Sequence, residues 1–381
     1  MCSENIQFVS EKTHSLRHPD TVRAWHGREP RPPASDRFNL HVCGRLCLFG
    51  EHSDWAAEHG IHQGHCLVVG TDQGIVAAVQ RADEFIVSTP VPNHNGQCST
   101  RTRKITCRWD AEALLSAATD ETEFFRYTTG VAYHVFAHPK VTGGVSIKIT
   151  SMDLPVKKGV SSSAAVCVLV ARAFDKVYGL GLYNKELMEL AYIGERLTGS
   201  RCGRMDQVCV YGKTPVLLQF RKSCPVRIEP VFPKRRIHMF FVDLAGTKDT
   251  VRILSDLQRS YPNSDDLQLA LGERNEAIVR AAYQALGEGD DEVFGRLMTE
   301  AQQNFDALVA PHSAEELRSP LLHRLLRFRD IAEHVYGGKG VGSQGDGTAQ
   351  FVARSAGDRE AAMKKIQNSF PKMRCYPLEI G

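Results

Sequence analysis

The stretch that decides the fold reads Leu154-Pro155-Val156-Lys157-Lys158-Gly159-Val160-Ser161-Ser162-Ser163-Ala164-Ala165-Val166. A β-prone run at 145–149 precedes it, and an apolar helical run at 164–178 follows. The start of a helix leaves backbone N–H groups without partners and carries partial positive charge. A glycine turn leading into it can therefore cradle an anion such as a phosphate. Serine is also a favoured helix cap, so the three serines by themselves fit simple capping equally well.

Composition limits the classes of protein to consider. The 381 residues exceed what one hydrophobic core usually holds, which predicts two domains. The net charge of +3 gives no reason to expect nucleic acid or a membrane surface as a partner. The 11 cysteines are scattered and form no C-x-x-C pair, which favours reduced thiols and a cytoplasmic location. We find no apolar run long enough for a membrane span and no signal-peptide core in the N-terminal arm.

Periodicity and turn residues predict a mixture of strands and helices. Strands are expected at residues 39–49, 66–70, 74–80, 85–91, 104–109, 145–149, 216–220, 237–244 and 348–353, with 66–70 and 74–80 forming a hairpin. Helices are expected at 124–136 (packed on the sheet), 164–178, 184–197, 265–286, 291–308, 314–335 and 358–370. The change from strand-rich to helix-rich sequence predicts domains at 1–230 and 231–381, with residues 1–38 as an arm of unknown role.

Polar residues gather directly after the strand at 39–49. Glu51, His52 and Asp54 follow its end, and Arg45 lies inside it among apolar residues. A buried arginine is costly unless something anionic meets it, which favours a site here over a solvated loop. Asp206 lies in a glycine-preceded turn, where a helix cap is the alternative to a functional role.

Two further patterns have competing interpretations. His59, His62 and His65 have the spacing of a possible zinc site, but the glycines between them argue against one regular helix and no second ligand cluster accompanies them. The glycine-dense segment 337–347 contains a literal dinucleotide fingerprint. We expect a helix before it and a strand after it, which is the reverse of what that fingerprint requires. Such a loop instead indicates close backbone approach, either to a ligand or to the other domain.

Four short motifs stand in order along the chain, and together they resemble the GHMP small-molecule kinases, most closely the galactokinases. They are residues 44–55, the phosphate-binding segment 155–164, the segment 202–207 around the catalytic aspartate and the glycine-rich segment 338–347. The resemblance implies an α+β, two-domain GHMP kinase fold. Its N-terminal domain is of ribosomal-protein-S5-like type, its C-terminal domain is ferredoxin-like, and the active site lies in the cleft between them.

The resemblance also implies the roles of individual residues. Asp206 and Arg45 would be catalytic, with Asp206 accepting or orienting the proton of the attacking hydroxyl. Glu51, His52 and Asp54 would bind the substrate. The implied ATP-binding residues are Gly159, Val160, Ser161, Ser162, Ser163, Ala164, Gly340 and Gly342. Ser163 and Glu195 would ligate Mg²⁺, Glu195 because it lies eleven positions before Asp206, as in mevalonate kinases.

The expected activity is ATP-dependent phosphorylation of a hydroxyl on a small polyhydroxylated substrate, such as a monosaccharide. Ala56-Ala57-Glu58 departs from the galactokinase turn at this point, which leaves the sugar open. One alternative is a galactokinase-like sensor that binds ATP and sugar without turnover. Another is a kinase for a non-sugar alcohol such as mevalonate, which the acidic Glu51 and Asp54 disfavour through repulsion of a carboxylate. Neither the oligomeric state nor the pathway can be read from the sequence.

Overall fold

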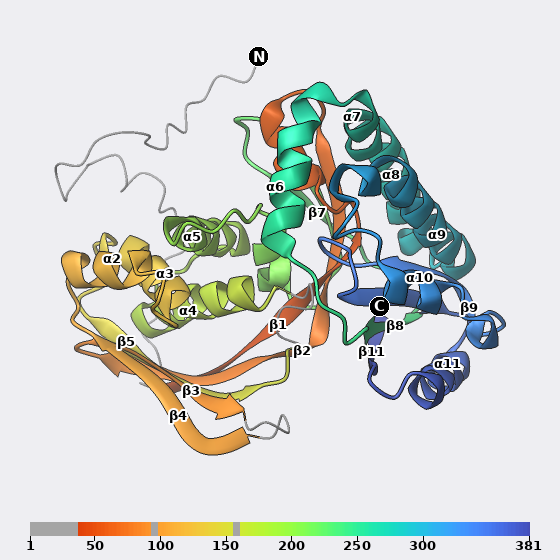
Figure 1. Cartoon of the computed structure of the whole chain (residues 1–381). Helices are drawn as coiled ribbons and strands as arrows, with labels where there is room; N and C mark the ends of the chain where they lie inside the picture. Colours follow the sequence, from red (N-terminus) through yellow and green to blue (C-terminus); the bar gives the residue numbers. More distant parts are fainter. Residues whose placement is uncertain (1–36, 93–97, 155–160) are drawn as a thin grey trace.

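The computed structural model describes residues 37–92, 98–154 and 161–381, in which two β-sheets carry helices on their faces (Figure 1). The larger sheet has the order β4-β3-β5-β2-β6-β7, with β1 paired to β2, and the smaller has the order β11-β8-β10-β9. The larger sheet contains β1 (Arg37–Phe49), β2 (Gly64–Ala82), β3 (Phe85–Pro92), β4 (Cys98–Cys107), β5 (Gly144–Met152), β6 (Val216–Phe220) and β7 (Arg227–Pro230). The smaller contains β8 (Ile237–Asp243), β9 (Val335–Gly340), β10 (Thr348–Ala353) and β11 (Arg374–Ile380).

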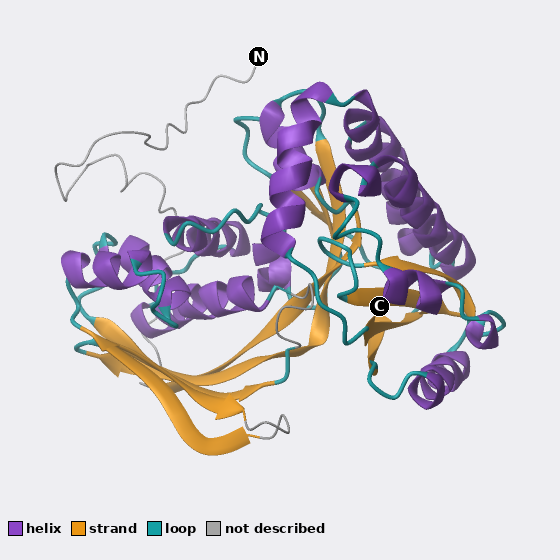
Figure 2. Ribbon diagram, in the orientation of Figure 1, coloured by secondary structure: helices purple, strands orange, loops and turns teal. Residues whose placement is uncertain are grey.

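Helices connect and cover the strands (Figure 2). The α-helices are α1 (Ser53–Ala56), α2 (Ala111–Thr119), α3 (Arg126–Phe136), α4 (Ser162–Tyr178), α5 (Asn184–Leu197), α6 (Thr250–Ser260), α7 (Asp265–Leu271), α8 (Glu273–Glu288), α9 (Asp291–Leu308), α10 (Pro320–Leu326) and α11 (Ala356–Ser369). Short 3₁₀ helices are η2 (Ala57–His59), η3 (Asp206–Tyr211), η4 (Tyr261–Asn263), η5 (Ala310–Ser313) and η6 (Arg329–Ile331). None of the described helices is both long and apolar enough to cross a membrane.

Helix α4 forms the centre of the layer over the larger sheet. It packs on β1, β2 and β5, and most of its apolar residues are fully buried. Helices α3 and α5 pack against α4 and against each other. The expected helix at 124–136 is confirmed as α3, and its buried Val131, Ala132 and Val135 belong to the same core cluster as the strands of the larger sheet.

The smaller sheet is apolar on both faces. Phe240 and Phe351 face α10 and α11, while Phe241 and Val352 join the core of the larger sheet. Helix α8 contacts β2, and α9 packs along β9, so the helical region lies against both sheets. One continuous core cluster therefore contains residues of both sheets.

The expected hairpin at 66–80 is wrong, because these residues form the single long strand β2. Gly70 and Gly74 suggest a turn, but here they allow close backbone approach. A Cβ on Gly70 would lie 2.2 Å from the Gly212 carbonyl oxygen, and one on Gly74 would lie 2.5 Å from that of Val42. Instead of a turn, the pairing of β2 with β1 has a register shift between Cys43 and Arg45.

Two expected helices are also corrected. The helix at 314–335 is not continuous, because Ser319 has a left-handed φ of 46° and Pro320 opens the short α10. Consequently the glycine-rich segment follows no helix: its first half is strand β9, which pairs with β10. The helix at 265–286 is divided at Gly272 into α7 and α8. Strands β7, β9 and β11 and helices α1, α2 and α6 are not among the expected elements.

The α+β fold with two sheets is confirmed. Strand β7 ends at Pro230 and β8 begins at Ile237, so the chain passes from one sheet to the other near the predicted boundary. The division into domains 1–230 and 231–381 stays a prediction, because the sheets share one core.

Candidate active site

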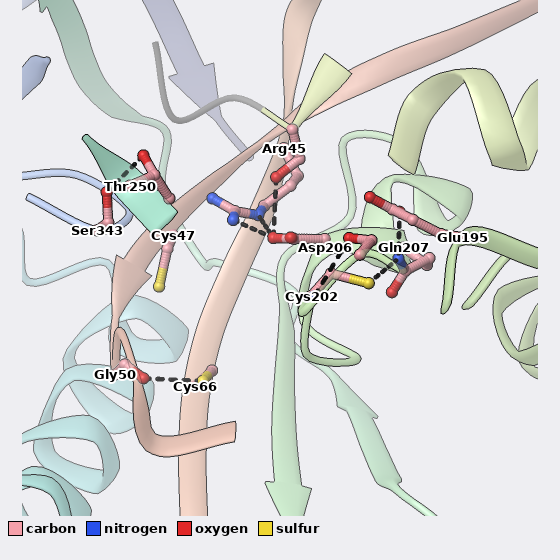
Figure 3. Close-up of polar contacts among 12 residues, drawn as sticks. Arg45, Cys47, Gly50, Cys66, Glu195, Cys202, Asp206, Gln207, Thr250 and Ser343 are labelled. Carbon is pink, nitrogen blue, oxygen red and sulfur yellow. Dashed lines mark hydrogen bonds and ion pairs between the residues drawn. The ribbon is translucent and has the colours of Figure 1, made fainter. Parts of the chain in front are cut away.

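Arg45 and Asp206 meet in the interior although 161 positions separate them (Figure 3). Arg45 Nε donates a hydrogen bond of 2.9 Å to Asp206 Oδ1, and Arg45 Nη2 contacts the same oxygen. Only 4% of Arg45 is exposed. Burial alone would lower the pKa of Arg45, but the carboxylate of Asp206 raises it above its ordinary value. The anionic partner expected for Arg45 is therefore the aspartate of the third motif along the chain.

Ser161 brings the start of α4 to the same carboxylate. Its Oγ donates a 2.8 Å hydrogen bond to Asp206 Oδ1. The residue has a left-handed φ of 52° and its side chain makes no capping hydrogen bond, so simple capping is not its role. Ser162 and Ser163 then form the first turn of α4.

The remaining predicted phosphate-binding residues divide into two groups. Ala164 is fully buried behind the serines. Gly159 and Val160 lie outside the described residues.

Glu195 lies on α5 and faces the interior rather than solvent, with 2% exposed. Gln207 Nε2 donates to Glu195 Oε2 at 2.8 Å, and the Ser163 hydroxyl also hydrogen-bonds this carboxyl group. Burial, followed by the charge of Asp206, raises the pKa of Glu195 to about 7. The two residues predicted to hold Mg²⁺ are thus direct neighbours.

Asp54 lies on α1 with 6% exposed, and its carboxylate packs against Gly203. Burial and then the charge of Asp206 raise the pKa of Asp54 to about 6, whereas Arg45 acts in the opposite direction. Asp54 and Glu195 thus each lie close enough to Asp206 to be affected by its charge, while Arg45 makes an ion pair with Asp206. Such an excess of carboxylates suits a site that receives a cation or hydroxyl donors.

His52 precedes α1 with a left-handed φ of 71°. Its Nδ1 accepts a 3.0 Å hydrogen bond from Trp55 Nε1, and its ring stacks on Phe305. Burial and the charge of Lys248 lower the pKa of His52 to about 3, so the imidazole is neutral near pH 7. As a neutral ring it can orient a hydroxyl group without adding charge.

Glu51 makes an ion pair that the sequence did not suggest. Its carboxylate contacts the Nζ of Lys339, and the two side chains are 5% and 1% exposed. Lys339 also donates to the Gly340 carbonyl oxygen at 2.8 Å. The predicted substrate-binding carboxylate is therefore already engaged, and it joins the first motif to strand β9.

The glycine-rich segment 338–347, the fourth motif along the chain, packs mainly against protein. The Gly340 N–H donates to Gln302 Oε1 at 2.7 Å, and a Cβ there would lie 2.2 Å from Gln344 Oε1. Gly342 has a positive φ of 66° and forms the turn between β9 and β10. Close approach to protein thus explains Gly340, and the predicted contact of both glycines with ATP stays a prediction.

Lys248 is a second cation that sequence reasoning missed. It follows β8 in the turn 245–249, and its Nζ donates to the Gln344 carbonyl oxygen at 2.6 Å. Beside it, the hydroxyls of Thr250 and Ser343 lie 3.2 Å apart (Figure 3). The signal available was its position after a strand end, where functional residues often lie.

The histidine pattern has no metal geometry among the described residues, which contain no group of three His, Cys, Asp or Glu side chains placed to hold an ion. His65 is buried in β2, and its Nε2 lies 3.7 Å from Glu276 Oε1. His59 instead packs against Trp55 and Tyr261.

Comparisons with known proteins agree with this geometry. Residues 126–213 match the family model described as GHMP kinases N terminal domain. The galactokinase of Thermotoga maritima is 23% identical over 291 residues, which cover 68% of this chain and 75% of that protein. The structure of Lactococcus lactis galactokinase complexed with galactose has a TM-score of 0.67 at 16% identity, covering 91% of this chain and 94% of that one. Methanococcus jannaschii mevalonate kinase has a TM-score of 0.67 at 16% identity, covering 92% and 100%.

The matched segment 126–213 contains the start of α4, Glu195 and Asp206, and Asp206 is the residue that contacts Arg45. The chain therefore contains a segment that matches the N-terminal domain of GHMP kinases, and over most of its length it resembles the galactokinases.

Proposed function

We propose that the protein is an ATP-dependent kinase that transfers the γ-phosphoryl group to a hydroxyl of a small polyhydroxylated molecule, a monosaccharide or a sugar derivative. The observation that carries the proposal is the buried Arg45–Asp206 pair, with Ser161 at the start of α4 bonded to the same carboxylate. Phosphoryl transfer needs chiefly positioning and stabilisation of charge, and this cluster offers both.

In this mechanism Asp206 Oδ1 or Oδ2 accepts the proton of the attacking hydroxyl as the new P–O bond forms. Arg45 holds Asp206 through Nε, while the rest of its guanidinium stabilises charge on the transferring group. ADP leaves with the electrons of the broken bond. Breaking the arginine contact should therefore lower turnover more than ATP binding.

ATP would bind at the start of α4, where the backbone N–H groups of the first turn suit its phosphates. The residues present also fit Mg²⁺, because Glu195 and the hydroxyl of Ser163 are hard oxygen donors in contact. The raised pKa of Glu195 marks a buried carboxyl group that a cation would favour as the anion. The ion would neutralise charge on the phosphates when bound. Two protein ligands match the usual preference of Mg²⁺ for phosphates and waters as its other ligands.

The acceptor would lie against Asp54 and the neutral His52, which together offer an acceptor-rich, orienting surface for hydroxyl groups. Asp54 lies close enough to the reacting carboxylate for the charge of Asp206 to raise its pKa. Glu51 would act behind this surface through Lys339.

The ion pair between Lys339 and Glu51 supports a second class of acceptor, an alcohol that carries a carboxylate. Lys339 neutralises Glu51, so the repulsion expected for a carboxylate-bearing alcohol comes from Asp54 alone. A mevalonate-like acceptor is therefore the second candidate.

The test is an ADP-release assay with Mg²⁺-ATP against free monosaccharides, uronic acids, amino sugars, polyols and mevalonate. Asp206→Asn serves as the inactive variant, and Asp175→Asn, on the far part of α4, as the matched control. Release with one sugar, lost only in Asp206→Asn, supports the proposal. Release with mevalonate alone selects the second candidate. No release, while calorimetry detects ATP and sugar binding, indicates a sensor and contradicts the kinase proposal.

A further inference from the structure

A second cavity, of about 500 Å³, lies between helix α9, the segment from α10 to η6 and strand β9. Within the described chain, neither Arg45 nor Asp206, Glu195 or Asp54 lines it. Its volume falls within the range of sites that take small molecules, roughly 300–1,000 Å³. It is therefore large enough for a ligand of its own.

Two arginines give this cavity a positive charge. Arg327 and Arg329 both line it, one on either side of Phe328 in the sequence. In the part of the chain that the structure describes, neither guanidinium makes an ion pair within 4.0 Å. The facing acid is Asp306, which lies 3.7 Å from His323. Two arginines against one shared carboxylate favour an anionic ligand, and guanidinium groups suit phosphate in particular.

Apolar side chains make up another part of the cavity lining. Phe328, Tyr336 and Phe351 contribute aromatic rings, and Leu326 and Ile331 contribute aliphatic side chains. A ligand that fills this space would need an apolar or aromatic body as well as its anionic group.

Gln302 connects the cavity to the glycine-rich segment 338–347. Its Nε2 donates to Asp306 Oδ1 at 2.7 Å, and its Oε1 accepts the Gly340 N–H at 2.7 Å. Only 5% of this side chain is exposed, so it cannot exchange either partner for water without moving. Gly340 follows Lys339, which holds Glu51 of the first motif. A change at Asp306 therefore has a direct physical route to the proposed active site.

We propose that this cavity is a second ligand site for a small phosphate monoester with an apolar or aromatic body, and that its occupation alters nucleotide affinity through Gln302. The binding part stands independently of the proposed function, and the coupling part rests on it.

Binding is tested by calorimetry on the full chain with phenyl phosphate, with benzyl alcohol as the uncharged probe. We expect 1:1 binding of phenyl phosphate, at least tenfold weaker in Arg327→Ala/Arg329→Ala. Binding should be unchanged in the matched control Arg296→Ala, an exposed arginine of α9 that does not line the cavity. It should also be unchanged in Asp206→Asn. Because the arginines are exposed, the double variant should keep its thermal midpoint.

Three results would overturn the binding part: no binding at millimolar phenyl phosphate, equal binding by the double variant, or loss of binding in Asp206→Asn. Each result would show either that phenyl phosphate does not bind or that it binds at another site.

Coupling is tested with a non-hydrolysable ATP analogue. Phenyl phosphate should change the analogue's affinity at least threefold in the wild type. It should still bind Gln302→Leu but no longer change the analogue's affinity there. An unchanged affinity in the wild type would contradict the coupling. If the analogue does not bind at all, the proposed function fails while the binding part keeps its own result.

Discussion

Arg45 lies inside the apolar strand β1 with 4% of its surface exposed, where a guanidinium without an anion would be strongly unfavourable. Asp206 meets it through one oxygen, which Nε and Nη2 both approach. A lysine at this position has one compact ammonium group and cannot reproduce that fork. The geometry of the pair therefore matters as well as its charge.

We predict that Arg45→Lys lowers kcat about a hundredfold or more, as loss of a group that stabilises the transition state does, with little change in ATP affinity. Steady-state kinetics and nucleotide calorimetry measure the two effects. Arg204→Lys is the control, because that arginine pairs with Glu189 and Glu58 away from Asp206. A kcat within threefold of wild type would contradict the assigned role.

Glu195 makes stability depend on pH. Its folded pKa of about 7 lies above the ordinary glutamate value of 4.5, so the protonated form is favoured in the folded protein. The associated stability is fully present below about pH 4.5 and is lost as pH rises through 7. The loss is on the order of 3 kcal/mol. We predict that Glu195→Gln unfolds at a higher temperature than wild type at pH 8 but at a similar temperature at pH 5. Equal differences at both pH values would exclude this explanation.

The resemblance to the GHMP kinases implied one site for Arg45, Asp54 and Asp206, and the structure brings these three side chains close together. The pairing of Glu51 with Lys339 could not be predicted, because the partners are 288 positions apart and a lysine in a glycine-rich segment has no local signature of burial. A charged residue among apolar ones indicates that an oppositely charged partner is required, but the sequence does not identify that partner.

Among the elements, segments that contain glycines were the hardest to predict. The segment 66–80 resembled a hairpin because Gly70 and Gly74 flank polar residues, yet β1 pairs along both halves of β2, with β6 beside the first half and β5 beside the second. The glycine-rich β9 resembled a loop for the same reason. In both segments the glycines allow a neighbouring backbone to approach closely and do not form a turn. A single sequence cannot distinguish these two uses of glycine.

The loop before η3 offers a test of the acceptor site. A Cβ on Gly203 would lie 1.8 Å from Asp54 Oδ2, so Gly203→Ala must displace that carboxylate. We predict that the KM for the acceptor rises about tenfold, a cost of about 1.4 kcal/mol, while the KM for ATP stays within twofold. Gly357→Ala is the matched control, since a Cβ there meets nothing closer than 3.8 Å. A parallel rise in both KM values would mean that Asp54 is not specific to the acceptor.

Three buried polar side chains join the two halves of the molecule. Lys339 meets Glu51, Gln350 Nε2 donates to the Cys47 carbonyl oxygen at 2.8 Å, and Asn275 Nδ2 donates to that of His65 at 2.9 Å. Each bond fixes the end of β1 or the adjoining part of β2 against the second sheet or helix α8. The first motif is therefore positioned by the whole molecule rather than by its own loop.

We predict that Lys339→Met costs about 3–5 kcal/mol of unfolding free energy, because it leaves the Glu51 carboxylate buried without a partner. The double variant Glu51→Gln/Lys339→Met should recover most of that loss. Denaturant unfolding of the four proteins in the cycle measures the coupling. If the double variant is as unstable as the sum of the single ones, packing rather than charge explains the loss.

The shared core makes a further prediction about cooperativity. Phe241 and Val352 of the smaller sheet lie in the same cluster as Val68 and Leu217 of the larger one, so separating the sheets would expose apolar surface on both. We therefore expect a single calorimetric unfolding transition despite the two sheets, with equal calorimetric and van't Hoff enthalpies. Two resolved transitions would show that the sheets unfold independently. The contacts made by Lys339, Gln350 and Asn275 would then position the first motif without making the two halves unfold together.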